Sequence, residues 1–162
     1  MSPGRARAAS TSTAAGTRSK RIDLVVQLAS VSAEIPARRL LKRWVSAAAE
    51  RRLDTTIRFV DEDEGRALNR TYRRKDRATN VLSFVYDDAP DRVCGDIVLC
   101  MPVLEREAHA SRKSVEAHCA HLVVHGVLHL QGYDHQRVRD AVAMEARERA
   151  ILAGLGFPDP YS

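Results

Sequence analysis

Residues 125–135 read HGVLHLQGYDH, and this stretch organises the interpretation of the whole chain. His125 and His129 are four residues apart, so on an α-helix they project from one face, one turn apart. Gly132 can adopt the left-handed conformation that ends a helix, after which the chain can return His135 to the same point. The spacing therefore predicts three imidazoles that converge at the end of a long helix and in the turn that follows it.

Three neutral imidazoles suit Zn²⁺ and leave a fourth coordination position for water, whose pKa the ion lowers to about 7. Structural zinc sites usually close all four positions and recruit cysteine, so an all-histidine set favours catalysis over scaffolding. We therefore expect one Zn²⁺ per chain at His125, His129 and His135. Other divalent metals such as Cu²⁺ or Ni²⁺ can compete for the same ligands.

The same helix is expected to run from about Ser114 to Leu130, which places His121 one turn before His125. His121 is interpreted either as a polar residue at the edge of a cleft or as one that orients a metal ligand through a hydrogen bond. Asp134 lies beside a ligand and has two possible roles: it can accept a hydrogen bond from an imidazole N–H, or it can cap the turn.

The apolar pattern of the remaining chain predicts an α+β fold, layered α/β/α, with about five helices and a mixed sheet of about four strands. A short link makes the last two strands an expected antiparallel hairpin, whereas the strand order is not fixed by the pattern. The expected strands are residues 22–28, 55–60, 81–86 and 93–100, and the expected helices are residues 36–48, 61–74, 102–111, 114–130 and 137–152.

The composition of the chain restricts its possible functions less than the spacing of the histidines does. The net charge is +5, but four basic residues and no acidic ones lie in residues 1–20, so the remaining body is nearly neutral. No apolar run approaches the roughly 20 residues that span a bilayer, which favours a soluble protein without a membrane partner. Three cysteines without a secretory signal favour a reducing compartment, and we expect a cytoplasmic location.

Two parts of the chain are distinguished by composition. Residues 1–20 lack apolar periodicity and are expected to form a disordered tail, with an organellar import signal as the minor alternative. Residues 21–162 show no repeat and are expected to form a single metallohydrolase domain.

The histidine spacing resembles the extended zinc motif of the metzincin proteases, H-E-x-x-H-x-x-G-x-x-H. In that motif the Glu beside the first His is the general base, and here its place is taken by Gly126. The resemblance therefore supports the metal geometry and argues against peptide hydrolysis.

A second resemblance is closer. The segment matches every specified position of H-G-x-L-H-L-x-G-Y-D-H, the hallmark of the YbeY endoribonucleases, which are bacterial ribosomal-RNA maturation factors. Residues 68–76 resemble the family's L-N-x-x-Y-R-x-K-D, residues 78–84 its T-D/N-V-L-S-F and residues 95–97 its G-D-I. Ala78 and Val85 depart from prolines that are common there, at positions not expected to touch the chemistry. The resemblance covers about residues 55–156.

The resemblance implies a single-strand-specific, zinc-dependent endoribonuclease that acts in rRNA 3′-end maturation, ribosome quality control and ribosome assembly. It implies single-stranded RNA and rRNA as substrates, and the ribosome or small-subunit proteins as partners. It also implies that the zinc is held by His125, His129 and His135 and that Arg73 is important for activity.

Arg73 belongs to the densest basic cluster outside the tail, which spans residues 70–77 and includes Arg77. We expect Arg73 to hold the scissile phosphate and to offset charge that develops in the transition state. Arg70, Arg74 and Lys75 are candidate phosphate contacts, although a solvated basic loop is the alternative. The sequence identifies no general base.

Two other functions remain open. One is a ribosome-assembly factor whose metal is mainly structural, and the open all-histidine coordination counts against it. The other is a different zinc hydrolase, such as an amidase or a protease, and the missing Glu at position 126 counts against that.

Overall fold

The computed structural model of the protein describes residues 20–162. The predicted tail therefore lies, apart from Lys20, outside the described residues, and it stays a prediction. Within residues 20–162, no helix combines the length and the apolar character needed to cross a bilayer. The strands are β1 (Ile22–Ala29), β2 (Arg52–Val60), β3 (Val81–Asp88) and β4 (Arg92–Cys100). The helices are α1 (Arg38–Ala48), α2 (Glu62–Arg73), α3 (Met101–Ala110), α4 (Val115–Leu130) and α5 (Val138–Gly154).

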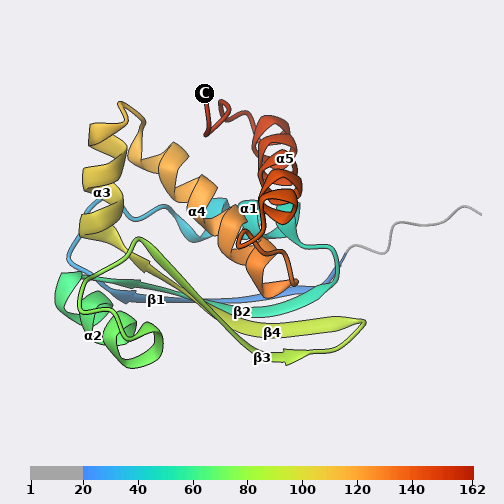
Figure 1. Ribbon diagram of the computed structural model, residues 1–162, viewed down its shortest axis with the longest axis horizontal. Coiled ribbons are helices and arrows are strands. Elements are labelled where there is room, and N and C mark those ends of the chain that lie inside the picture. Colours follow the sequence, from blue (N-terminus) through green and yellow to red (C-terminus); the bar gives the residue numbers. More distant parts are fainter. Residues whose placement is uncertain (1–19) are drawn as a thin grey trace, which may run out of the picture.

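The four strands form one mixed sheet in the order β1-β2-β4-β3 (Figure 1). β1 pairs with β2 in parallel, and α1 connects them. β2 pairs with β4 in parallel, and the chain between these two strands passes through α2 and β3. β3 runs antiparallel to β4, with Val81 opposite Leu99, which confirms the predicted hairpin and places β3 at the edge of the sheet. The predicted α+β class, with about four strands and five helices, is confirmed.

Helices cover both faces of this sheet, as the layered prediction required. The larger core lies between the sheet and the helices α1, α3, α4 and α5, and it contains Leu53, Ile57 and Phe59 of β2. On the opposite face, Val60 and Val98 belong to a smaller apolar cluster that α2 covers. The alternation along β2 follows from the pleat, because successive side chains point to opposite faces.

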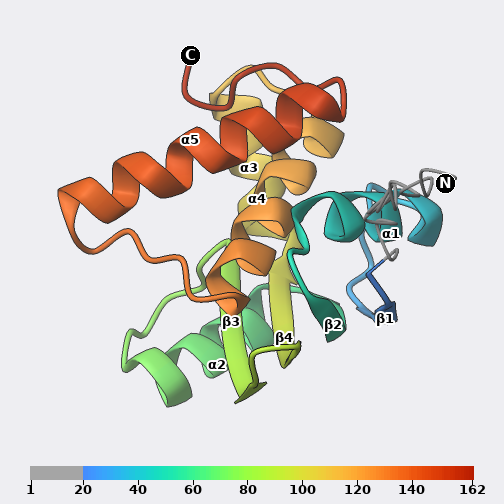
Figure 2. The same ribbon diagram turned by 90° about the vertical axis from the view of Figure 1, so that its right-hand side faces the viewer.

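Helix α4 crosses the sheet at the centre of the molecule and contacts α1, α3 and α5 (Figure 2). Its start is fixed by Ser114, whose hydroxyl accepts a hydrogen bond from the backbone N–H of Ala117 at 3.0 Å. Its second half lies directly on β4: a Cβ at Gly126 would stand 3.1 Å from Ile97, and one at Gly95 only 2.6 Å from Leu130. The buried face of α4 thus anchors the histidine-bearing turns to the sheet.

Candidate metal centre

The structure brings the three predicted ligands together at the end of α4. The ring centroids of His125 and His129 are 4.5 Å apart, and those of His129 and His135 are 4.9 Å apart. One donor atom from each of the three side chains lies within 4.8 Å of the others. Gly132 makes this return possible, since its φ of +97° lies in the region that glycine tolerates.

The three imidazoles fit a zinc-like ion in both geometry and protonation. Around tetrahedral Zn²⁺, with Zn–N bonds of about 2.0–2.1 Å, ligand nitrogens stand about 3.3 Å apart. His129 Nε2 and His135 Nδ1 are 3.0 Å apart. Burial, with a further contribution from His125 and His135, lowers the pKa of His129 to about 4, so this imidazole is neutral at pH 7 and keeps a lone pair for a metal.

Sequence reasoning missed one residue of this cluster, Glu148 on α5. Its side chain is fully buried, and Oε1 lies 2.5 Å from His125 Nδ1 while Oε2 lies 3.0 Å from His121 Nε2. The hydroxyl of Tyr161 donates a third hydrogen bond, to Oε2. Burial raises the pKa of Glu148, but the hydrogen bonds from His121, His125 and Tyr161 outweigh it and lower the pKa to about 2.

A signal for Glu148 was present in the sequence. The buried residues of α5 are Met144, Glu148, Ile151 and Leu152, which recur at helical spacing and share one face. A carboxylate within an apolar stripe is rarely buried without a hydrogen-bonding partner, so the sequence predicts such a partner for Glu148. The partner itself lies on another helix, which spacing along the chain does not reveal.

The two residues expected beside the ligands differ in what they do. His121 is linked to His125 by hydrogen bonds through Glu148, because both imidazoles bond to the same carboxylate. Asp134 Oδ1 accepts hydrogen bonds from the backbone N–H groups of His135 and Gln136, at 2.7 and 3.2 Å. Asp134 thus caps the turn that carries His135, which was one of its two expected roles.

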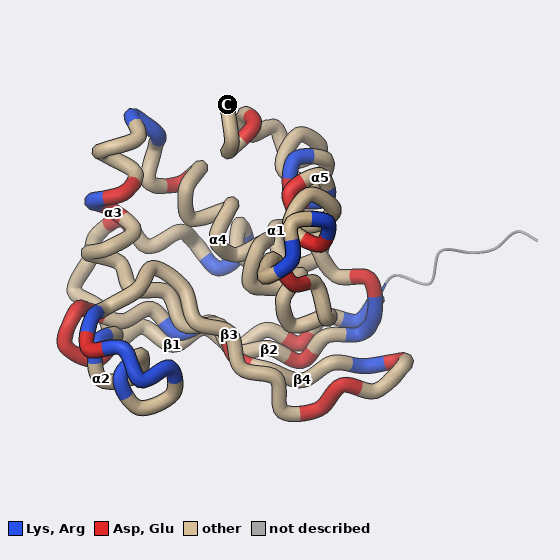
Figure 3. Tube along the Cα trace, in the orientation of Figure 1, with Lys and Arg blue, Asp and Glu red and all other residues tan. Residues whose placement is uncertain are grey.

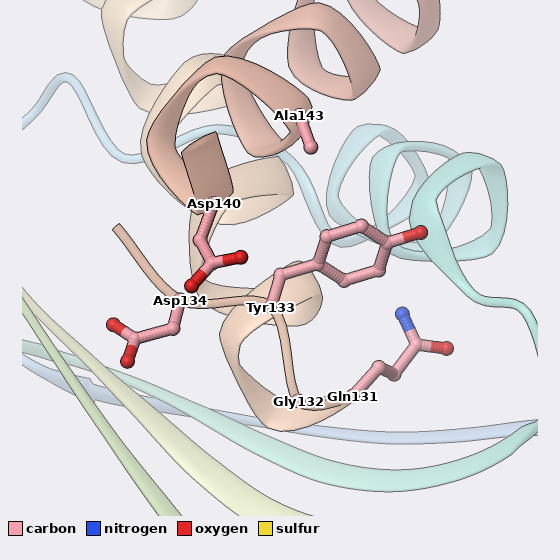
Figure 4. A pocket seen from close by; sticks show the side chains of 6 residues that line it. All are labelled: Gln131, Gly132, Tyr133, Asp134, Asp140 and Ala143. Atoms are coloured by element: carbon pink, nitrogen blue, oxygen red, sulfur yellow. The ribbon is translucent and has the colours of Figure 1, made fainter. Parts of the chain in front are cut away.

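The turn is also held from its other side. The side chains of Asp134 and Tyr133 leave it in opposite directions, and Tyr133 points toward α1 (Figure 4). There its hydroxyl donates to Glu50 Oε1 at 2.6 Å. A pocket of about 320 Å³ lies between this turn and the first turns of α5, where Asp140 faces it. These contacts fix the segment between α4 and α5.

A larger cleft, of about 480 Å³, joins the histidines to the basic segment. His129 and His135 line one side of it, and Arg73, Lys75 and Arg77 line the other. The remaining lining residues are Asn69, Thr79, Val81, Leu82, Asp134 and Gln136.

The cleft separates the candidate phosphate contacts into two groups. Lys75 lines it, and so does Arg77, which the sequence analysis had counted only as part of the cluster. Arg70 and Arg74 do not line it. Arg70 lies 3.9 Å from Asp76 in an exposed ion pair, and Arg74 follows the last residue of α2 with a φ of 56°.

Three local contacts position the basic side of the cleft. Arg73 is the last residue of α2, and its Nη2 donates to the backbone oxygen of Ser83 in β3 at 3.3 Å. The buried side chain of Asn69 donates to the backbone oxygen of Arg77 at 2.7 Å. Arg66 holds both carboxylate oxygens of Asp76, at 2.8 and 2.9 Å. Figure 3 shows the Lys and Arg residues gathered at this end of α2.

Comparisons with known proteins point to one family. Residues 26–156 match the family model described as Endoribonuclease YbeY. The protein of that name from Nitrosomonas europaea is 53% identical over 138 residues, which cover 85% of this chain and 84% of that protein. Its namesake from Aromatoleum aromaticum is 51% identical over 149 residues, covering 90% and 96%. The one from Cupriavidus necator is 57% identical over 130 residues, covering 80% of this chain and 66% of that protein.

One solved structure shows the same fold. The solution structure of a Thermotoga maritima protein aligns with a TM-score of 0.52 and 21% sequence identity. The alignment covers 87% of this chain and 99% of that chain, so the likeness extends over nearly the whole architecture.

Proposed function

The chain belongs to the YbeY endoribonuclease family, and we propose that it is a zinc-dependent endoribonuclease that cleaves single-stranded RNA. The proposal extends to rRNA 3′-end maturation, ribosome quality control and ribosome assembly in the cytoplasm, with the ribosome or small-subunit proteins as partners. One observation carries it: a single cleft joins two of the three candidate zinc ligands to Arg73 and Lys75.

The residues around the cleft would have different roles in the proposed reaction. Bound zinc, held by His125, His129 and His135, would supply Lewis acidity and an activated water. Arg73 would hold the non-bridging oxygens of the scissile phosphate, because a guanidinium donates paired hydrogen bonds and stays charged. Its charge would stabilise the negative charge that builds up during cleavage.

Lys75 and Arg77 would bind the phosphates on either side of the scissile one. Both line the cleft beside Arg73, and neither is in an ion pair with a described residue. Their positive charges suit the RNA backbone regardless of base sequence. A cleft of about 480 Å³ has room for one or two nucleotides, which fits the proposed single-stranded substrate.

The geometry also counts against a protease. A side chain at position 126 would point at Ile97, since a Cβ there stands 3.1 Å from two atoms of that residue. A Glu at this position would face the sheet rather than the cleft, so it would not act as the general base of a metzincin-like mechanism. The close packing of α4 on β4 thus explains why a glycine, and not a Glu, stands at position 126.

Metal analysis paired with RNA cleavage tests the proposal. The wild type should hold about one zinc per chain and cut a labelled single-stranded RNA but not the same sequence in a duplex. His129→Ala should lose both metal and cleavage. Arg73→Ala should keep the metal and lose cleavage. Arg39→Ala, an exposed arginine on α1, is the matched control and should behave as the wild type.

The rival function makes a different prediction for the same proteins. A wild type that holds zinc but cuts no single-stranded RNA, even with ribosomes added, would identify an assembly factor with a structural metal. Cleavage of a precursor rRNA at its 3′ end, in preference to an unrelated RNA of equal length, would support the maturation role.

A further inference from the structure

The ligand His125 is backed by a buried hydrogen-bond network that the proposed reaction does not use directly. Glu148, on a different helix, accepts hydrogen bonds from His125, His121 and Tyr161. An ionised carboxylate only accepts hydrogen bonds, so each of its partners must donate. His125 therefore carries its ring proton on Nδ1, and its Nε2 is left with the lone pair that a metal needs.

Tyr161 is itself held by the segment that follows α5. Arg149 contacts this segment twice: its Nε donates to Asp159 Oδ1 at 3.2 Å, and its guanidinium carbon lies 5.0 Å from the centre of the Tyr161 ring. Asp159 Oδ1 also accepts from the backbone N–H of Tyr161 at 2.8 Å. Lys113, before α4, donates to the backbone oxygen of Pro160. In Figure 2 this segment passes over the start of α4.

The contacts of Tyr161 point inward toward the histidines. Its ring packs edge-on against His121, with centroids 5.3 Å apart, and its hydroxyl reaches Glu148. The segment after α5 thus holds the carboxylate through Oε2, while His125 bonds to Oε1. Because Glu148 is fully buried, it has no access to water that would replace a lost donor.

We propose that Glu148 is the positioning residue of the metal centre and that Tyr161 acts as a latch on it. Together they fix the tautomer and the ring orientation of His125, and so raise the affinity of the site for zinc. Removing such a partner of a metal-binding histidine typically costs about 10–100-fold in metal affinity. The inference rests on the proposed zinc site, but it does not depend on RNA being the substrate.

A second ion is the competing interpretation of the same residues. His121, His125 and Glu148 also place donor atoms within 4.8 Å of one another. An ion there would have to bind His125 through Nδ1 while the first ion binds Nε2, and the ring would then lose its proton altogether. The hydrogen bonds already present satisfy both carboxylate oxygens without this cost.

Zinc titration of the whole chain separates these interpretations. After metal removal, zinc affinity is measured by competition with a chromogenic chelator, and the ligand geometry by the visible spectrum of the cobalt-loaded protein. Glu148→Gln should bind zinc about 10–100-fold more weakly. Tyr161→Phe, which removes one oxygen atom, should show a smaller loss of affinity in the same direction. Both variants should change the cobalt spectrum.

The matched control is Glu34→Gln, the same chemical change on an exposed side chain that forms no ion pair with a described residue. Because Glu34 takes no part in the hydrogen-bond network, this variant should retain wild-type zinc affinity and cobalt spectrum. If Glu148→Gln fails to fold, as judged by circular dichroism of the metal-free protein, Tyr161→Phe still carries the test.

Three outcomes would overturn the inference. Wild-type affinity and spectrum in a folded Glu148→Gln or in Tyr161→Phe would show that the network only stabilises the fold. Two zinc ions per wild-type chain would establish the second ion. A wild type that binds no zinc would remove the metal centre itself. Zinc binding without RNA cleavage would instead contradict the proposed function and leave this inference standing.

Discussion

The two sides of the cleft are built in opposite ways. The histidine side belongs to α4 and to the turn that follows it. α4 is packed against three helices and the sheet, and the candidate ligand His125 is backed by the buried Glu148. The basic side follows the end of α2 and is mostly exposed: Arg73 donates to the backbone of Ser83, and Asn69 holds the backbone of Arg77. One side is pre-organised, and the other can adjust.

This difference suits two different ligands. A metal ion requires its donor atoms at fixed distances, and buried hydrogen bonds supply that rigidity. A single-stranded RNA is flexible and presents a phosphate at every nucleotide, so charges on mobile side chains are sufficient to bind it. The comparison predicts that substitutions on the histidine side reduce activity by weakening metal binding. Substitutions on the basic side should reduce activity without changing the zinc content.

Metal removal should have the largest effect on activity. Chelation should reduce RNA cleavage to background, and zinc should restore it, because the ion supplies the activated water. The circular dichroism spectrum should hardly change, since α4 is anchored by apolar packing and not by the metal. Loss of helix on chelation would contradict the idea that the histidine side is pre-organised.

Arg73→Ala should have the next largest effect. Removing one donor to a developing negative charge typically costs about 10²–10³-fold in rate. The loss should appear in kcat for RNA cleavage, while the zinc content stays at one per chain. Arg74→Ala, next to it but outside the cleft, should lose far less. Equal losses in the two variants would mean that the segment acts only through its total charge.

Gly126→Ala should lower stability by about 1–2 kcal/mol, because the cost of overpacking a core exceeds the roughly 1 kcal/mol that alanine gains over glycine within a helix. The added methyl group would stand 3.1 Å from the fully buried Ile97, so one of the two would have to shift by a few tenths of an ångström. The free energy of unfolding of each variant is measured by urea denaturation. The control is Gly154→Ala at the end of α5, where a Cβ meets nothing within 4 Å. That variant should be neutral or up to about 1 kcal/mol more stable. A neutral Gly126→Ala would show that the histidine side is looser than described.

Lys75→Ala should have the smallest effect. Losing one phosphate contact should reduce the slope of log affinity against log salt concentration by about 1, and it should do so for every RNA sequence. Fluorescence anisotropy with a metal-free protein measures binding without cleavage. An effect confined to one RNA sequence would mean that Lys75 reads a base rather than a phosphate.

Local patterns in the sequence predicted the elements but not their arrangement. The long helix was placed within a residue of α4, because Ser114 caps it and its apolar residues recur at helical spacing. The start of β2 was missed by three residues, because the polar Thr55 stands on the buried face between Leu53 and Ile57 and interrupts the apolar alternation. That β2 and β4 lie side by side depends on how distant segments of the chain are connected, and no local sequence pattern indicates this.

The same distinction holds for the site. His125, His129 and His135 lie within eleven residues of one another, so their convergence followed from helix geometry and one glycine turn. Glu148 comes from α5, and its register against α4 is set by packing across the core. On the basic side, α2 ends at Arg73 and the chain turns at once, and that turn decides that Lys75 faces the cleft.

A zinc-edge anomalous difference map, from a crystal of the zinc-loaded protein, tests the central claim most directly. The account predicts one strong peak per chain, within bonding distance of His125, His129 and His135, with His125 bound through Nε2. A peak between His121, His125 and Glu148 instead, or no peak near the three histidines, would contradict it.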